Sequence, residues 1–244
     1  MNVLILIPSY KRARVIDLTL AKLIEYHQPT HDVTICVADN KTSPATDAAI
    51  RKHKDSANAK GIEFNNVFNE KNIGKAKALN ILLEMYDAPK YDTIVTMDND
   101  MVVKMPWYNT IDSFMKTGFD FVGVGSKTFW YHYPTNADRL TVEKIDDFHI
   151  VRITSIAGGM LIHKPNFIRS FKWTNAGGVY GEDDGQMCRN TSNKAVLYRN
   201  EDWLDHDPLT FTDVATNELK EYDNKKLTLL KNRTYVFSEG WDEI

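Results

Sequence analysis

The first part of the chain alternates short apolar runs with segments in which apolar residues recur at helical spacing. The apolar runs cover residues 3–7, 33–38, 67–68 and 93–97, and proline or polar residues follow each of them. Such runs are typical of strands that are buried on both faces of a sheet. The periodic segments between them predict helices over residues 16–27, 45–54 and 75–86.

This alternation predicts an α/β fold of the Rossmann-like kind, with a mostly parallel central sheet flanked by helices. In such sheets, ligands bind just beyond the carboxyl ends of the strands. Polar segments follow the four predicted strands at residues 9–12, 39–40, 69–74 and 98–100. We therefore expect these segments, which are far apart in sequence, to meet at one edge of the sheet and to form a binding site.

The second half of the chain has a less regular pattern. It predicts strands at residues 119–124, 150–153, 157–162 and 194–198, and a helix at residues 217–230. Residues 129–133 are almost all aromatic, which is typical either of core packing or of a surface on which an acceptor stacks. Neither a linker rich in serine and proline nor a repeat divides the sequence, so a single compact domain is expected.

Composition narrows the class of protein but does not identify it. The 244 residues are 43% hydrophobic and 26% charged, with a net charge of -3, so neither disorder nor a global attraction to nucleic acid is expected. The two cysteines, Cys36 and Cys188, lack zinc-ligand spacing and are expected to be reduced. The apolar run at residues 3–7 is too short for a signal peptide, and no run approaches a membrane span. These features predict a cytoplasmic protein.

The triplet Asp98-Asn99-Asp100 directly follows the fourth predicted strand. Residues i and i+2 leaving a strand can point the same way, and two neighbouring carboxylates repel each other unless a cation lies between them. Hard oxygen ligands suit Mg²⁺ or Mn²⁺. The alternative is a polar turn without a ligand.

Three further residues near the predicted strand ends are candidates for binding a nucleotide. Asp39 can accept hydrogen bonds from a base, and Arg12 can pack on a base or neutralise a phosphate. Gly74 opens the third predicted helix, where the backbone favours an anion, although the pattern of a Walker loop is missing. The alternatives are a capping role for Asp39 and a solvated surface role for Arg12.

The second half contains two further candidate segments. Residues 181–184 form the densest acidic cluster of the chain and are either a solvated loop or the source of a general base. His206 lies between Asp205 and Asp207 and could complete a metal shell, although most histidines in proteins have no such role.

Taken together, these features are similar to the GT-A glycosyltransferases, and most of all to inverting enzymes of family two. The resemblance covers about the first 206 residues. The motifs that carry it are Ile7-Pro8-Ser9-Tyr10-Lys11-Arg12, Val37-Ala38-Asp39-Asn40, Asn72-x-Gly74-x-x-x-Ala78-x-Asn80, Asp98-Asn99-Asp100, Ala157-Gly158-Gly159-Met160 and Gly181-Glu182-Asp183.

The resemblance assigns roles to individual residues. It implies a Mn²⁺ or Mg²⁺ ion held by Asp98, Asp100 and His206, and a catalytic base at Asp183 with Glu182 beside it. Because Gly185 weakens the helix start, Asp184 remains an alternative base. The implied donor-binding residues are Pro8, Tyr10, Arg12, Asp39, Gly74, Lys75, Asp98, Asn99, Gly158 and Gly159.

The resemblance also implies the reaction and a division of the chain. A sugar would pass from a nucleotide sugar, with UDP favoured, to an acceptor hydroxyl with inversion. Residues 1–105 would bind the donor, residues 106–206 would bind the acceptor, and residues 207–244 would form a tail or lid. The acceptor is left open, and it includes polysaccharide, protein, lipid headgroup, small metabolite and nucleic-acid base.

Two other functions fit the same fold. A sugar-nucleotide nucleotidyltransferase would share the acidic metal site, but it should carry a glycine-rich loop after the first strand, where residues 8–12 contain no glycine. A non-catalytic protein that binds carbohydrate or nucleotide would not need the intact acidic pairs.

Overall fold

The computed structural model describes residues 1–40, 43–125, 142–152, 156, 159–174, 183–199 and 203–206. The predicted aromatic segment at residues 129–133, the predicted helix at 217–230 and the predicted lid at 207–244 lie outside the described residues.

The amino-terminal half is a repeated strand–helix unit with parallel strands. β2 pairs with both β1 and β3, β1 also pairs with β4, and all three pairings are parallel, as the alternation of the sequence predicts. The elements are β1 (Asn2–Ser9), α1 (Ala13–Glu25), β2 (Asp32–Asp39), α2 (Pro44–Ala59), β3 (Glu63–Phe68), α3 (Lys75–Glu84), the 3-10 helix η1 (Ala88–Lys90) and β4 (Thr93–Met97).

The second half mixes parallel and antiparallel strands. β10 is parallel to β6, whereas β9 runs antiparallel to both of its neighbours, β4 and β6. The elements are β5 (Met101–Val103), α4 (Tyr108–Met115), β6 (Phe121–Gly125), β7 (Val142–Ile145), β8 (Phe148–Val151), β9 (Met160–His163), α5 (Pro165–Ser170), α6 (Asp183–Asn190), β10 (Lys194–Tyr198) and β11 (Leu204–His206).

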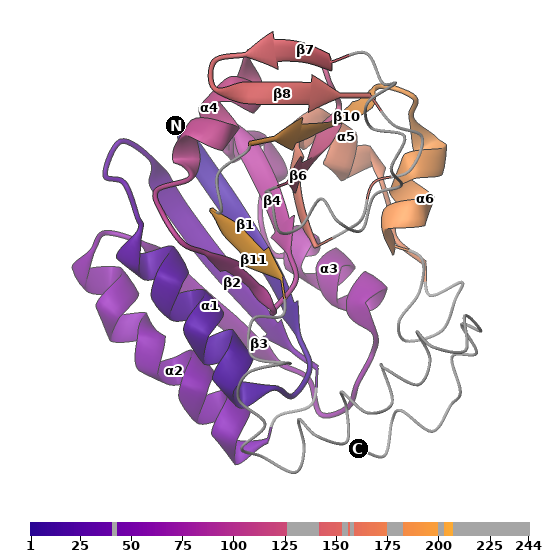
Figure 1. The fold of residues 1–244 in the computed structure, drawn as a ribbon. Coiled ribbons are helices and arrows are strands. Elements are labelled where there is room, and N and C mark those ends of the chain that lie inside the picture. The colour runs from indigo at the N-terminus through magenta and orange to yellow at the C-terminus, as the bar shows by residue number, and fades with distance from the viewer. Residues whose placement is uncertain are drawn as a thin grey trace, which may run out of the picture.

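The two halves share one large sheet. Its nine strands follow the order β3-β2-β1-β4-β9-β6-β10-β8-β7, so β9 joins the parallel half to the mixed half (Figure 1). A separate two-stranded sheet pairs β11 with β5, directly after the end of β4. The mostly parallel α/β sheet expected from the sequence is therefore present, with antiparallel strands concentrated in the second half.

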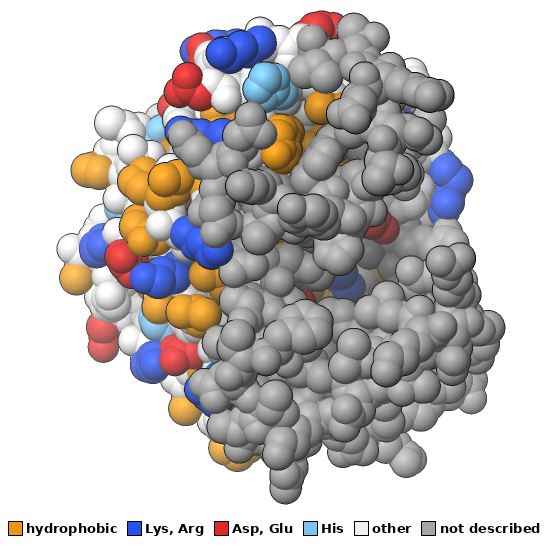
Figure 2. All heavy atoms as spheres, in the orientation of Figure 1, with side chains coloured by type: hydrophobic (Ala, Val, Ile, Leu, Met, Phe, Trp, Pro, Cys, Tyr) orange, Lys and Arg blue, Asp and Glu red, His pale blue; other side chains and the backbone are white. Residues whose placement is uncertain are grey.

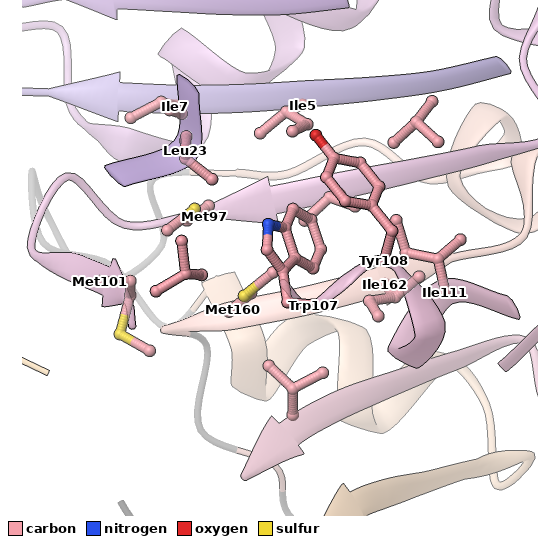
Figure 3. Close-up of a cluster of buried hydrophobic side chains, with 14 of the residues drawn as sticks. Ile5, Ile7, Leu23, Met97, Met101, Trp107, Tyr108, Ile111, Met160 and Ile162 are labelled. Atoms are coloured by element: carbon pink, nitrogen blue, oxygen red, sulfur yellow. The ribbon is translucent and has the colours of Figure 1, made fainter. Parts of the chain in front are cut away.

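The sheet buries both of its faces. Alternate residues of β1 point to opposite sides, so Ile5 packs in a cluster with residues of α1, α2 and α4, while Leu4 packs in a cluster with residues of α3 and α5. Figure 3 shows part of the first cluster, in which Trp107 and Tyr108 lie among side chains of β1, α1, β4 and β9. Both rings are fully buried. This packing holds α4, which the sequence did not predict, against the sheet.

Several predicted boundaries differ from the structure. The strand expected at residues 150–153 is β8, which ends at Val151, and the strand expected at 157–162 is β9, which begins at Met160. The short helices α4, α5 and α6 were not predicted, because eight or fewer residues carry little helical periodicity. α6 runs through Gly185, so this glycine does not prevent the helix from starting at Asp183.

The structure describes both cysteines and part of the charged surface. Cys36 and Cys188 are both free thiols, and burial raises the pKa of Cys36 to about 11, so this thiol is protonated at neutral pH. On the face seen in Figure 2, basic and acidic side chains intermingle over α1 and α2. None of the helices in the described part of the chain is both long enough and apolar enough to cross a membrane.

Candidate functional site

The ends of β1, β2 and β3 are joined by backbone hydrogen bonds beyond the last sheet residues. Ser9 lies opposite Asp39 in the parallel register, and the Asn40 N–H donates to the Ser9 carbonyl at 2.8 Å. The Asn69 N–H donates to the Asp39 carbonyl at 2.8 Å. The polar segments that follow three separate strands therefore lie side by side, because parallel strands end at the same edge of a sheet.

A cavity of about 130 Å³ lies at this edge. Its lining combines residues that follow β1, β2 and β4 with residues that precede and begin α3. The lining residues are Pro8, Ser9, Tyr10, Arg12, Asn40, Asn72, Lys75, Asp98, Asn99 and Asp100.

Asp98, Asn99 and Asp100 form a tight turn between β4 and β5. The Met101 N–H donates to the Asp98 carbonyl at 3.2 Å, and the Asn99 carbonyl accepts from the Thr19 hydroxyl at 2.9 Å. The alternative of a polar turn therefore describes the backbone correctly. Because both carboxylates also line the cavity, the turn presents them to whatever binds there.

Each carboxylate of the turn is paired with a basic side chain. Arg12 Nη1 lies 2.7 Å from Asp100 Oδ2, and both side chains are almost fully buried, at 4% and 10% exposed. Lys75 Nζ lies 2.5 Å from Asp98 Oδ1, and these side chains are 24% and 27% exposed. One pair is therefore part of the protein interior, whereas the other is accessible from solvent.

The backbone before α1 adopts an uncommon conformation. Lys11 and Arg12 have φ values of 53° and 59°, in the left-handed region that non-glycine residues seldom occupy. Arg12 is the N-cap of α1, and its side chain makes no capping hydrogen bond. Strained residues of this kind persist where the surrounding contacts determine them, and here the buried ion pair with Asp100 is such a contact.

The amino-terminus of α3 faces the same cavity through Lys75. Gly74 caps the helix with a φ of 84°, and its N–H donates to the Asn72 side-chain oxygen at 3.0 Å. The first turn of α3, which is described in full, contains Lys75 and Lys77 and no acidic residue. Because the amino-terminus of a helix carries partial positive charge, this arrangement favours an anion beside it.

β11 brings the far end of the domain next to the acidic turn. β11 pairs with β5 in a register that places His206 opposite Met101, the residue after Asp100. Trp203, which precedes β11, is buried and donates from Nε1 to the Gly125 carbonyl at 3.1 Å. The backbone of His206 is therefore close to the candidate metal residues, while its side chain lies outside the described part of the structure.

The structure describes some of the remaining predicted site residues in full, and others only in part or not at all. Gly159 is adjacent to the turn, because its carbonyl accepts from the Asp98 N–H at 2.8 Å. Asp39 ends β2 at the site edge but is fully buried, and Asn40 lines the cavity in its place. Asp183 is the first residue of α6. Gly158, Glu182 and the side chain of Asp183 lie outside the described residues.

Three lining residues, Ser9, Asn40 and Asn72, belong to the strand-end segments expected at the site but were given no role of their own. Each lies inside a motif that was recognised, within two residues of a residue to which a role had been given. Giving a role to every polar residue of these strand-end segments would have included them.

The oxygen ligands available at the cavity suit a hard divalent cation. Within the described ranges, no cluster of three or more His, Cys, Asp and Glu side chains forms a metal site by itself. Asp98 and Asp100 nevertheless line the cavity, and carboxylate oxygens are the ligands that Mg²⁺ and Mn²⁺ prefer. These ions usually take their remaining ligands from substrate phosphates and water.

Several solved structures share this fold. The chain superposes on TarS from S. aureus with a TM-score of 0.59 and 14% identity, covering 82% of this chain and 60% of that one. For the mannosyltransferase PcManGT from Pyrobaculum calidifontis, in complex with GDP-Man and Mn²⁺, the TM-score is 0.60 and the identity 15%, with 82% and 55% covered. For GalNAc-T7 with UDP, GalNAc and Mn²⁺, the TM-score is 0.62 and the identity 12%, with 100% and 53% covered. The chain thus spans little more than half the length of these structures.

Sequence comparison gives the family. No curated protein matches the chain by sequence alone. The model of the family described as glycosyl transferase family 2 matches residues 4–170, which contain β1 to α5 and all lining residues of the cavity. The chain therefore belongs to glycosyl transferase family 2.

Proposed function

We propose that the protein transfers a sugar from a nucleotide sugar, with UDP favoured, to an acceptor hydroxyl with inversion at the anomeric carbon. The observation that carries this proposal is the convergence of Asp98, Asp100, Arg12 and Lys75 on one cavity at the carboxyl ends of β1 and β4. Both carboxylates and cations are needed where a diphosphate and its divalent ion bind together. TarS has been solved with UDP and with UDP-GlcNAc, which supports UDP as the first nucleotide to test.

The proposed donor site uses the residues that line or adjoin the cavity. Asp98 and Asp100, with His206, would hold Mn²⁺ or Mg²⁺, which when bound stabilises the charge on the departing diphosphate. Arg12, Lys75 and the N–H groups at the start of α3 would bind phosphate oxygens. Pro8 and Tyr10 would contact the nucleotide, and Asn40, next to the buried Asp39 at the end of β2, would recognise the base. Gly159 would leave room for the sugar.

The proposed acceptor chemistry belongs to the acidic segment at the start of α6. Asp183 would remove the proton from the acceptor hydroxyl while the oxygen of that hydroxyl attacks the anomeric carbon. Glu182 would orient a hydroxyl group of the acceptor or the donor. Asp184 is the alternative base. It is partly buried within the first turn of α6, where its Oδ1 accepts from the Gly185 N–H at 2.9 Å. We also propose that residues 1–206 form the transferase domain and that residues 207–244 form either a tail or a lid that closes over the donor.

A two-step experiment tests this function. Thermal-shift screening of UDP-, GDP-, dTDP- and CMP-sugars, with Mn²⁺ or with a chelator, should show stabilisation by one nucleotide only when Mn²⁺ is present. Release of nucleotide from that sugar should also require Mn²⁺. If the wild-type protein neither binds nor hydrolyses any of these donors, the proposed function is wrong.

Variants at the acidic segment then identify the base. Asp183→Asn should keep the thermal shift with donor and lose transfer, while Asp184→Asn should keep both. The reverse result would assign the base to Asp184. Full turnover by both variants would remove this segment from proton transfer.

A further inference from the structure

The two basic residues of the cavity are held in different ways. Arg12 is almost fully buried, follows a backbone turn with positive φ and contacts Asp100 at 2.7 Å. Lys75 is about a quarter exposed and reaches Asp98 with a flexible side chain from the first position of α3. An arginine held in a fixed geometry suits a permanent contact. A lysine on a flexible stem suits a contact that can be exchanged for another.

Lys75 also occupies a position that is unfavourable for a cation. The first turn of a helix favours acidic side chains, because the free N–H groups give it partial positive charge. The described first turn of α3 instead contains Lys75 and Lys77. The carboxylate of Asp98 provides the negative charge that offsets this arrangement. If Asp98 engages another cation, Lys75 therefore needs a different anion.

The charges of the cavity favour binding of a divalent ion and a diphosphate together over binding of either one alone. Asp98, Asp100, Arg12 and Lys75 together are neutral. A divalent ion alone would leave two excess positive charges, and the diphosphate of a nucleotide sugar alone would leave two excess negative charges. Both together restore neutrality, provided that the ammonium group of Lys75 turns from Asp98 to the diphosphate.

We infer that Lys75 is a displaceable counter-ion: it neutralises Asp98 in the free enzyme and passes to the donor diphosphate when a divalent ion takes its place on Asp98. This inference rests on the proposed function and extends it to the coupling between ion and donor. Arg12 keeps its contact with Asp100 throughout, while its other N–H groups bind the diphosphate. Because coupling is reciprocal, the ion and the donor each strengthen the binding of the other.

The test measures two dissociation constants in the Lys75→Met variant. Without nucleotide, the Kd of Mn²⁺, measured by electron paramagnetic resonance, should fall about fivefold, because the competing ammonium is gone. At saturating Mn²⁺, the Kd of UDP, measured calorimetrically, should rise about fivefold, because the diphosphate loses a partner. The two constants should thus change in opposite directions.

Matched variants separate this role from a structural one. Lys77→Met removes the same charge from the exposed side of the same helix turn and should change neither constant. Lys75→Arg keeps the charge and should return both constants most of the way to their wild-type values. A purely structural role for Lys75 would weaken both ligands in Lys75→Met, and a role in donor binding alone would leave the Kd of Mn²⁺ unchanged.

The inference is overturned if Lys75→Met binds Mn²⁺ alone no more tightly than the wild-type protein does. This failure differs from a failure of the proposed function. In the first case, the wild-type protein still binds UDP with Mn²⁺ and hydrolyses a nucleotide sugar. In the second case, it does neither, and the inference falls with the function.

Discussion

The two halves of the sheet bring residues toward the cavity by different means. In the amino-terminal half, β1, β2 and β4 are parallel neighbours, so the residues that follow them meet at one edge by topology alone. In the second half, Gly159 arrives through the antiparallel strand β9, and His206 through the pairing of β11 with β5. The first arrangement depends on strand order, whereas the second depends on packing and pairing between distant segments. The following predictions test this difference.

The largest expected effect is on activity, at the end of β4. Asp100→Asn removes a proposed metal ligand and leaves the buried guanidinium of Arg12 without its carboxylate. Turnover should fall about 100-fold or more, and the dependence of UDP binding on Mn²⁺ should disappear. The exposed residue Asp87 provides the control, since Asp87→Asn should retain both properties. Normal turnover in Asp100→Asn would show that the parallel strand ends do not carry the chemistry.

A second prediction concerns packing in the second half. A Cβ atom on Gly123 of β6 would lie 2.3 Å from Cγ2 of the buried Ile156, which precedes the Gly159 segment. Gly123→Ala should therefore cost about 2 kcal/mol of unfolding free energy and lower the Tm by roughly 6 °C. Gly118→Ala meets nothing within 4 Å and serves as the control in the same calorimetric measurement. Equal Tm values for the two variants would mean that β6 and Ile156 are not in tight contact.

A third prediction concerns the boundary between the halves, where β9 pairs with β4. His163 of β9 is fully buried with Nε2 2.8 Å from the Thr96 hydroxyl, and burial lowers its pKa to about 3. The imidazole stays neutral in the fold, whereas in the unfolded chain it takes up a proton below its ordinary value of 6.5. Stability from this residue is therefore complete above that value and is lost as the pH falls toward about 3.

Urea unfolding measures this effect. From pH 7.5 to pH 5.5, the free energy of unfolding should fall by roughly 1 kcal/mol through His163. His163→Met should have a shallower slope over this interval, whatever its absolute stability. An identical slope in the variant would remove His163 from the acid sensitivity of the sheet.

The smallest effect is expected at the periphery of the second half. Asp146 lies in the turn between β7 and β8 and accepts hydrogen bonds from Lys116 and from Ser113 of α4, which lower its pKa. Because the pKa of a carboxyl group is lowered, its contribution is present above the ordinary value near 3.8 and is lost as the pH falls through the folded value. Asp146→Asn should speed hydrogen exchange in residues 142–151. It should not change the global unfolding midpoint, because the side chains of Asp146 and Lys116 are both exposed and their ion pair contributes little. Unchanged exchange would mean that the turn is held by other contacts.

The sequence predicted the amino-terminal half well, because its signals are local. The run at residues 3–7 and the polar residues after it lie within one motif, and β1 differs from this run only at its ends. The same holds for Asp98 and Asp100 after β4, which line the cavity as part of the predicted edge. In these cases, strand order converts a local pattern into a position in space.

The sequence predicted the second half less well, because its positions depend on long-range contacts. The place of β9 between β4 and β6 has no signature in residues 157–162 themselves. The pairing of Lys75 with Asp98 and of Arg12 with Asp100 was likewise not predicted, since side-chain partners far apart in sequence leave no periodic trace. The positive φ values of Lys11 and Arg12 also follow from tertiary contacts and not from their residue types.

The small sheet of β5 and β11 has a consequence for how the protein is made. β5 is synthesised early, directly after the acidic turn, but its partner strand ends at His206. A nascent chain can complete the parallel strands while they leave the ribosome, because domains fold in part as they are synthesised. It cannot cover β5 until the residues matched by the family model, 4–170, and the chain up to His206 have been translated. A chain interrupted before Trp203 would therefore leave β5 with an open edge, where strands of other molecules can add.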